Sequence, residues 1–202
     1  MSESVRITAR PLARVARLLG LAAFVAGITG GVSVATRLSS ASAAGSGDAR
    51  PARHVVLRGA SLRGASMESA SLANAVLTGA DLRTAHLAGA DLRATSLARA
   101  RLDFADLRRA DLTDGSLFCA HLRRADLSRA DLENTVLSKA DLSHANLCGA
   151  DMAGAMLYQA DLRGADLTGA NLWDANLSGV LCNSQTRWPA GFGPEAGGSG
   201  VR

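Results

Sequence analysis

The stretch Ala80-Asp81-Leu82-Arg83-Thr84 is one copy of a five-residue phrase that the chain repeats without insertion from residue 55 to residue 179. Leucine, or methionine at two positions, stands at every fifth residue from Leu57 to Leu177, which makes twenty-five consecutive units. The residue two positions before it is nearly always Ala. A fixed period covering most of a chain indicates a repeat architecture, and it therefore determines the fold.

A period of five residues fits neither regular secondary structure. In an α-helix, residues five apart are rotated by a net angle of about 140°, so the leucines would spiral around the axis. In a flat strand, an odd period places successive leucines on opposite faces. Every Leu and Ala is buried together only if the chain turns a corner after each unit and coils around its own side chains. The period therefore predicts a parallel β-solenoid.

A second period gives the number of sides. The residues before the central leucines include two series with intervals of 20, so four units complete one coil. At the usual strand spacing of about 4.8 Å, six and a quarter coils make a rod of roughly 30 Å. The two series are Val56, Val76, Ser96, Ser116, Val136, Met156 and Asn176, and Asp91, Asp111, Asp131 and Asp151.

The phrase A-(D/N)-L-x-x resembles the repeat of the pentapeptide-repeat protein family, over about three fifths of the chain. The resemblance implies an all-β fold, a right-handed quadrilateral parallel β-helix, which we expect over residues 55–184. The segment 186–194 is similar to a T-x-W-P-x-G-F ending found in the family. We expect residues 185–202 to form a cap, with Trp188 and Phe192 over the last core layer, and a disordered tail. A competing interpretation of these aromatics is a partner-binding tail.

The N-terminal part predicts membrane targeting. Residues 18–36 are uncharged and mostly apolar, and four arginines precede them. A span of about 17 to 25 residues crosses a bilayer, whereas signal peptides carry about 7 to 15 apolar residues. We therefore expect a hydrophobic helix that anchors the chain, within a basic segment 1–37, and a flexible linker over 38–54. Alternatives are a signal cleaved near Ala43, which would release a secreted protein, and a buried soluble helix.

The arginine distribution gives an expected orientation. Four arginines precede the apolar segment and three follow it before the repeats, which favours a cytoplasmic N-terminus and a repeat domain outside the cytoplasm. The reverse topology would place the rod in the cytoplasm. The pI of 9.6 comes from the first 54 residues, which carry a net charge of +5, while the repeats carry −2. Nucleic-acid binding is therefore not expected.

Two faces of the predicted rod differ in chemistry. The apolar face, made of the units centred on Leu57 and every twentieth residue after it, has no acidic residue and a charge of +3 from Arg58, Arg99 and Lys139. We interpret it as a contact surface for a protein partner or a second copy. The alternative is that these side chains pack along the ladder between coils. Its candidate interaction residues are Val56, Val76, Phe118, Val136, Met156 and Tyr158.

The acidic face, made of the units centred on Leu72 and every twentieth residue after it, carries a charge of −6. Its aspartates either form a functional surface or bond to turn backbone, as Asp does in turns. Some members of the family resemble DNA in shape and charge and protect DNA gyrase, so the resemblance implies a DNA-mimicking role as an alternative function. The acidic candidates are Asp91, Asp111, Asp114, Asp131, Glu133, Asp151 and Asp174, opposed by Arg93 alone.

Flat faces around a narrow core of Leu and Ala leave no concave site, so we expect no enzyme activity, cofactor, metal or small-molecule ligand. The predicted function is a non-enzymatic, membrane-tethered or exported rod that acts as a protein-interaction scaffold.

Overall fold

The computed structural model describes residues 55–192. The predicted N-terminal helix at 18–36, the linker at 38–54 and most of the predicted tail lie outside these residues. Between residues 55 and 192 no helix is present, and hence none that could cross a membrane.

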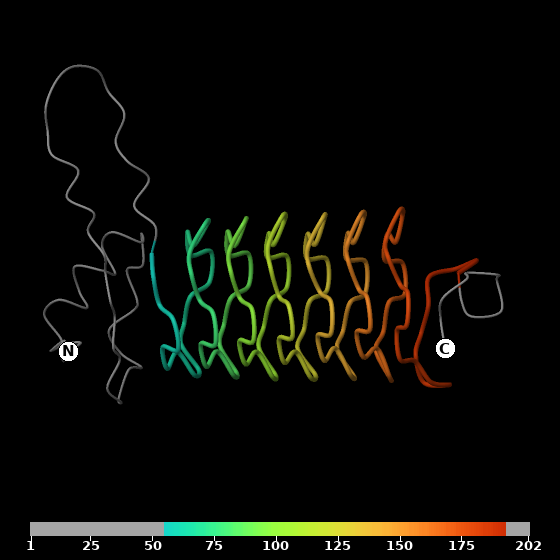
Figure 1. Ribbon diagram of the computed structural model, residues 1–202, viewed down its shortest axis with the longest axis horizontal. Helices are drawn as coiled ribbons and strands as arrows, with labels where there is room; N and C mark the ends of the chain where they lie inside the picture. The colour runs from blue at the N-terminus through green and yellow to red at the C-terminus, as the bar shows by residue number, and fades with distance from the viewer. Residues whose placement is uncertain (1–54, 193–202) are drawn as a thin grey trace, which may run out of the picture.

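Each five-residue unit contributes one residue to a β-ladder and then turns. The residue before the central leucine forms a parallel bridge with the residue twenty positions later, as in Val56 with Val76 and Asp161 with Leu181. These isolated bridges are the only extended elements in the described part of the chain. Four units therefore complete one coil, and the coils stack evenly into a straight four-sided rod (Figure 1). This confirms the predicted quadrilateral parallel β-helix.

Backbone hydrogen bonds run along the rod axis. The Leu57 N–H donates to the Val76 carbonyl at 2.7 Å, and the Val76 N–H donates to the Val55 carbonyl at 2.8 Å. Within each unit, a turn closes with a bond such as Ala60 N–H to the Leu57 carbonyl, at 3.1 Å. Because these bonds recur along the rod, each coil is joined to the next by main-chain hydrogen bonds although no strand exceeds one bridge residue.

The core is two side chains wide at every level. The central leucines from Leu57 to Leu172 and the Ala residues before them are buried along the whole rod, with methionine replacing leucine in two units. Fully burying one Leu stabilises the fold by about 1.5 to 3 kcal/mol. Thr95 and Thr135 occupy inward Ala positions, where their hydroxyls donate to the carbonyls of Leu72 and Leu112 at 2.8 and 3.0 Å. These inward hydroxyls are thus satisfied inside the rod.

The corners require an unusual backbone conformation. The second residue after each central leucine has a positive φ, for example 61° at Gly59, 58° at Arg99 and 60° at Lys139. A positive φ at the second central position is the geometry of a type II turn. Glycine adopts it freely, whereas an L-residue in the left-handed region loses roughly 1 to 2 kcal/mol.

At the C-terminal end the period shifts by one residue. Asp166 bridges with Arg187, twenty-one positions later, and the Thr186 hydroxyl donates to the Leu162 carbonyl at 2.9 Å. Bridging thus continues past the predicted end of the repeats at residue 184. Trp188 is half-buried against the core, and its ring lies 5.6 Å from that of Phe192, centroid to centroid. That these two aromatics act as a cap stays a prediction.

The cost of the corner conformation can be measured with two alanines. Ala94 is a second corner residue, with a φ of 52°, whereas Ala98 is a first corner residue without a positive φ. We expect Ala94→Gly to raise the free energy of unfolding by about 0.5 to 1 kcal/mol, because the left-handed strain is relieved. Ala98→Gly should lower it by a similar amount. Urea denaturation of both variants measures the difference, and a loss of stability in both would contradict this account of the corners.

Candidate functional site

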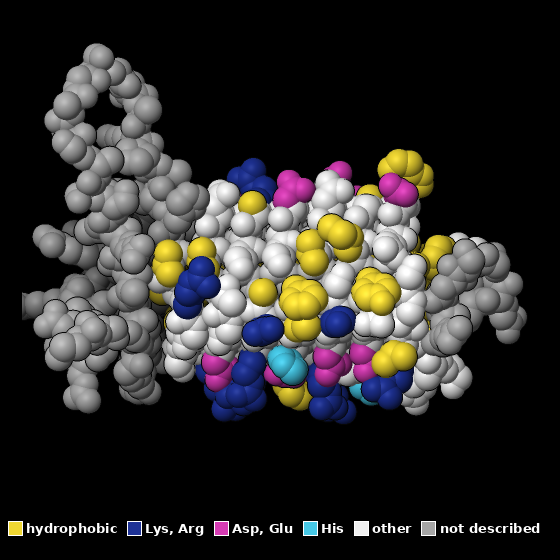
Figure 2. All heavy atoms as spheres, viewed as in Figure 1, with side chains coloured by type: hydrophobic (Ala, Val, Ile, Leu, Met, Phe, Trp, Pro, Cys, Tyr) yellow, Lys and Arg dark blue, Asp and Glu magenta, His cyan; other side chains and the backbone are white. Residues whose placement is uncertain are grey.

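The apolar face presents its side chains from the bridge residues and the first corner residues. Val56, Val76, Val136 and Phe118 are half-buried, whereas Met156 is 45% exposed and Tyr158 43% exposed. Figure 2 shows hydrophobic side chains along the middle of the visible side of the rod, with Lys or Arg side chains beside them. The rod thus carries a row of apolar groups accessible from one direction.

Ladder packing accounts for only part of this row. Val56 bridges with Val76, and Val136 bridges with Met156, so these side chains flank one another along the axis. Tyr158 is a corner residue and takes no part in a bridge. The packing alternative therefore suffices for the half-buried valines but does not explain the exposed ring of Tyr158.

On the acidic face, four aspartates hold the turns. Asp91, Asp111, Asp131 and Asp151 each accept a hydrogen bond from the backbone N–H two residues later, at 3.1 to 3.3 Å. Asp91 and Asp111 also flank Arg93, at 2.8 and 3.5 Å. These carboxylates therefore have a structural role, which the turn interpretation predicted. The use of this face for binding stays a prediction.

The remaining acids of that face have a different environment. Asp114, Glu133 and Asp174 are exposed, and none forms an ion pair or a side-chain hydrogen bond with another residue of the 55–192 segment. The same is true of Arg58, Arg99 and Lys139 on the apolar face. Each of the two faces thus carries three charges of one sign that have no ion-pair partner among residues 55–192.

On the two other faces, three of the nine arginines, Arg83, Arg108 and Arg163, are paired inside their own unit. Arg108 donates to Asp106 through Nε at 2.7 Å and Nη2 at 2.6 Å, and Arg163 binds Asp161 in the same way. The guanidinium hydrogen bond is the largest cause that lowers the pKa of Asp161 below its usual value. These three pairs neutralise charge locally.

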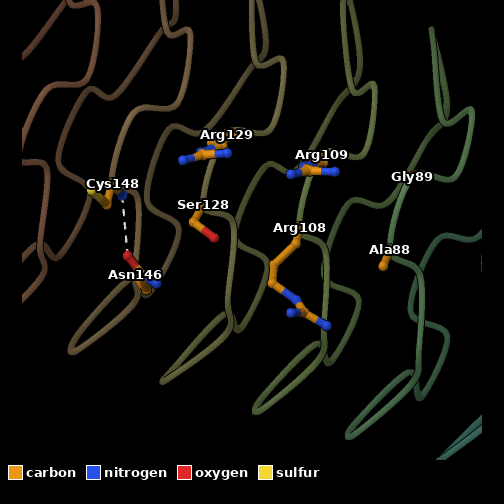
Figure 3. A pocket seen from close by; sticks show the side chains of 8 residues that line it. All are labelled: Ala88, Gly89, Arg108, Arg109, Ser128, Arg129, Asn146 and Cys148. Atoms are coloured by element: carbon orange, nitrogen blue, oxygen red, sulfur yellow. Dashed lines mark hydrogen bonds between the residues drawn. The ribbon is translucent and has the colours of Figure 1, made fainter.

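A shallow hollow lies on the face centred on Leu107 and Leu127, with a volume of about 680 Å³. It is lined by residues that include Arg108, Arg109, Arg129 and Cys148. Figure 3 shows Arg109 and Arg129 side by side on neighbouring coils, with Arg108 turned away from them. The guanidinium of Arg108 forms an ion pair with the carboxylate of Asp106. The hollow is open to solvent and brings together no pair of groups suited to proton transfer.

Within residues 55–192 no group of side chains is arranged to bind a metal ion or to activate a thiol. No three His, Cys, Asp or Glu side chains converge there to hold a metal ion, and Cys119, Cys148 and Cys182 form no disulfide within that segment. Burial raises the pKa of Cys182. A raised pKa makes this thiol a poorer nucleophile at neutral pH.

Two exposed aromatics escaped the sequence analysis. Trp173 lies on the acidic face and is 76% exposed, and Phe104 lies at a corner with the Arg124 guanidinium 5.8 Å from its ring centroid. Both occupy outward positions of the repeat, one and two residues after a central leucine. The register of the repeat is the signal that would have found them.

Comparison with models of known protein families shows the family to which the chain belongs. A family model described as Pentapeptide repeats matches residues 53–87, 77–114, 116–154 and 149–181, which together cover more than half of the chain. The chain belongs to the pentapeptide-repeat family. No curated protein is significantly similar to it.

Solved pentapeptide-repeat structures resemble the rod. Rfr23 from Cyanothece 51142 is 44% identical, with a TM-score of 0.46, and covers 46% of this chain and 63% of its own. HetL from Nostoc PCC 7120, involved in heterocyst differentiation regulation, is 36% identical, with a TM-score of 0.44, and covers 63% of this chain and 62% of its own. This chain thus spans less than two thirds of either protein.

The plasmid-mediated fluoroquinolone resistance protein QnrB1 is 21% identical, with a TM-score of 0.46, over 64% of this chain and 80% of its own. Likenesses at these identities and TM-scores say nothing about the partners of this pentapeptide-repeat chain.

The arginine pairs predict a pH dependence of stability. Because Asp161 has a lowered pKa in the folded state, the unfolded state binds a proton first as the pH falls. The stabilisation that the ionised Asp161 carboxylate provides is therefore complete above the unfolded pKa of about 3.9, and it is lost as the pH falls through the lower folded pKa.

The substitution Asp161→Asn should keep the turn but lose the charge, because Asn146 and Asn171 accept the same backbone hydrogen bond in their own units. We expect this variant to be less stable than the parent at pH 6 and equally stable near about pH 2, measured by thermal unfolding. A difference that is constant with pH would contradict this.

Proposed function

We propose that this pentapeptide-repeat rod is a non-enzymatic scaffold that binds protein through its apolar face. The observation that carries the proposal is the exposure of Met156 and Tyr158 on a face that has no acid and three positive charges, none of which forms an ion pair within the described coils. Exposed apolar rows rimmed by charge mark protein contacts. This face is also the one face of the repeats that carries no acid, so its basic side chains have no counter-charge within their own face.

The shape of the rod supports binding rather than catalysis. Enzymes assemble convergent groups in a concave site. Here the outward side chains of the described coils diverge from four flat faces, and several of their titratable groups pair within single units. A flat, regular face suits a broad contact with another protein.

The proposal includes a tether or export. It rests on the apolar segment 18–36, the four arginines before it and the linker 38–54. In this arrangement the rod is held outside the cytoplasm, anchored or, after cleavage near Ala43, released.

The charge distribution favours this scaffold over a DNA-mimicking role at gyrase. A DNA mimic needs net negative charge around its surface, whereas here one face carries −6 and the three other faces together carry +4. Four of the seven acids on that face are already bonded to turn backbone. Direct binding of the full chain to gyrase would reverse this preference.

Site-specific photo-cross-linking tests the apolar face. A photoreactive side chain at Tyr158 should cross-link to protein in intact cells, whereas one at Cys148 should give several-fold less product. Both are exposed first corner residues, but Cys148 lies on the opposite face. Lys139→Glu should weaken the Tyr158 product, because it reverses a charge beside it. Equal products at both positions would refute the assignment of the face.

Cell fractionation with external protease tests the tether. We expect the full-length chain in the membrane fraction, with its repeats cleaved by added protease. Mass spectrometry of the membrane-bound and released species distinguishes an anchor from cleavage near Ala43. A full-length chain protected from protease would place the rod inside the cell and contradict the proposed orientation.

A further inference from the structure

The hollow on the face centred on Leu107 and Leu127 contains two stacked arginines. Arg109 and Arg129 occupy the same corner position of consecutive coils, and both are exposed. Neither guanidinium forms an ion pair or a hydrogen bond within residues 55–192. Both line the hollow, where Figure 3 shows them side by side. Two like charges are therefore held next to each other with no acid paired to either.

No other Lys or Arg pair of the described repeats has this arrangement, in which the same position of consecutive coils carries two basic side chains without ion pairs. Arg63 and Arg83 also stack, but Arg83 is paired with an aspartate of its own unit. Arg99 and Lys139 share a column of the apolar face, but an uncharged residue separates them. Consecutive coils lie about 4.8 Å apart, so one small anion can contact both guanidinium groups of the hollow.

The fold does not require arginine at these two corners. Arg109 and Arg129 have φ angles of 56° and 57°, in the left-handed region that glycine adopts more readily. Glycine stands at the same position in the coils before and after, at Gly89 and Gly149. Two adjacent positive charges also repel each other. Both effects lower the stability of the free rod, and binding of an anion would offset the repulsion.

The neighbours of the pair are small, as at Ala88, Ser128 and Cys148, and they leave a hollow of about 680 Å³. Ligand sites usually have about 300 to 1,000 Å³. The Ser128 hydroxyl forms no hydrogen bond within the described coils, and in Figure 3 it points toward the coil of Arg109. Arg108 is already paired within its own unit. The hollow thus offers three donor groups to a ligand, two guanidinium groups and one hydroxyl.

We propose that this hollow binds the phosphate group of a phosphate monoester. Such a group carries a charge of about −1.5 to −2 at pH 7 and three strong acceptor oxygens. Its charge matches that of Arg109 and Arg129 together, and its three oxygens match the two guanidinium groups and the Ser128 hydroxyl. The site lies opposite the apolar face, so it goes beyond the proposed scaffold. It also departs from the expectation that a rod with flat faces binds no small molecule.

Alkylation of Cys148 measures whether the hollow is filled. Cys148 lines the hollow and is exposed, whereas Cys119 lies on the apolar face and serves as an internal control. The purified full chain, in mild detergent and low salt, is treated with iodoacetamide at increasing concentrations of glycerol phosphate, and peptide mass spectrometry gives the rate at each thiol. We expect the rate at Cys148 to fall several-fold, with a half-maximal effect at about 1 mM, while the rate at Cys119 stays constant. An unchanged rate at Cys148 up to about 50 mM would overturn the proposal.

Glycine substitutions test the two arginines without endangering the fold. Arg109→Gly with Arg129→Gly should weaken the protection of Cys148 by about tenfold or more, because both charged donors are lost. Thermal unfolding should show a variant at least as stable as the parent, since glycine relieves the positive φ. The matched control is Arg99→Gly with Lys139→Gly, which removes two charges from the same corner position on the opposite face, where φ is 58° and 60°. An equal loss of protection in the control would indicate unspecific attraction of anions and overturn the site.

Other anions identify the ligand class and its source. At equal ionic strength, inorganic phosphate should protect Cys148 and acetate should protect it several-fold less, because acetate has one charge and two oxygens. Equal protection by acetate would overturn the assignment to phosphate monoesters. Vesicles of phosphatidylcholine with phosphatidic acid present the same group on a membrane. Protection by these vesicles at a lower phosphate concentration than glycerol phosphate requires would assign a lipid headgroup as the source, whereas protection by glycerol phosphate alone would assign a soluble ligand.

Discussion

The structure depends on the backbone ladder that joins each residue to the one twenty positions later. A bridge such as Val56 to Val76 recurs at every unit and leaves room between opposite faces for one Leu and one Ala layer. The ladder is stable only if those side chains fill the interior without voids, since a buried methylene contributes about 0.8 kcal/mol. A larger residue would push the faces apart and break bonds in the neighbouring coils. Uniform leucine is thus a consequence of the ladder geometry.

The same geometry leaves the identity of the surface residues largely unconstrained. Three of every five side chains point outward, and neither core nor ladder dictates them beyond a turn preference for Asp or Asn. Asp131 illustrates that preference, because its carboxylate receives the Glu133 N–H at 3.1 Å. The carboxylate of Glu133 accepts no such hydrogen bond from the turn backbone of the described residues. Within one unit, an acid that maintains the fold stands two residues from one that is available for binding.

This division explains what the sequence predicts and what it does not. The period gives the coil, the four faces and the inward leucines, because one register places every residue. It could not separate Asp131 from Glu133 by role, since that depends on a local bond distance. It also gave no sign that Thr95 and Thr135 turn their hydroxyls inward onto carbonyls, or that one extra residue before Thr186 still lets Arg187 join the ladder. A pattern of residue types records spacing, whereas these outcomes depend on single hydrogen bonds.

Rigidity links this architecture to binding. The corner and bridge residues are held by backbone bonds at both ends, so neighbouring charges in one column stay about 4.8 Å apart, the spacing of stacked strands. Because the rod surface is already ordered, a partner that matches that spacing causes little loss of conformational entropy in the rod. The entropy cost of association then comes mainly from ordering the partner's side chains and from lost rigid-body freedom. A second rod has the same spacing by construction. A rigid partner with matched periodicity would therefore bind this surface at a lower cost in entropy than a flexible peptide would.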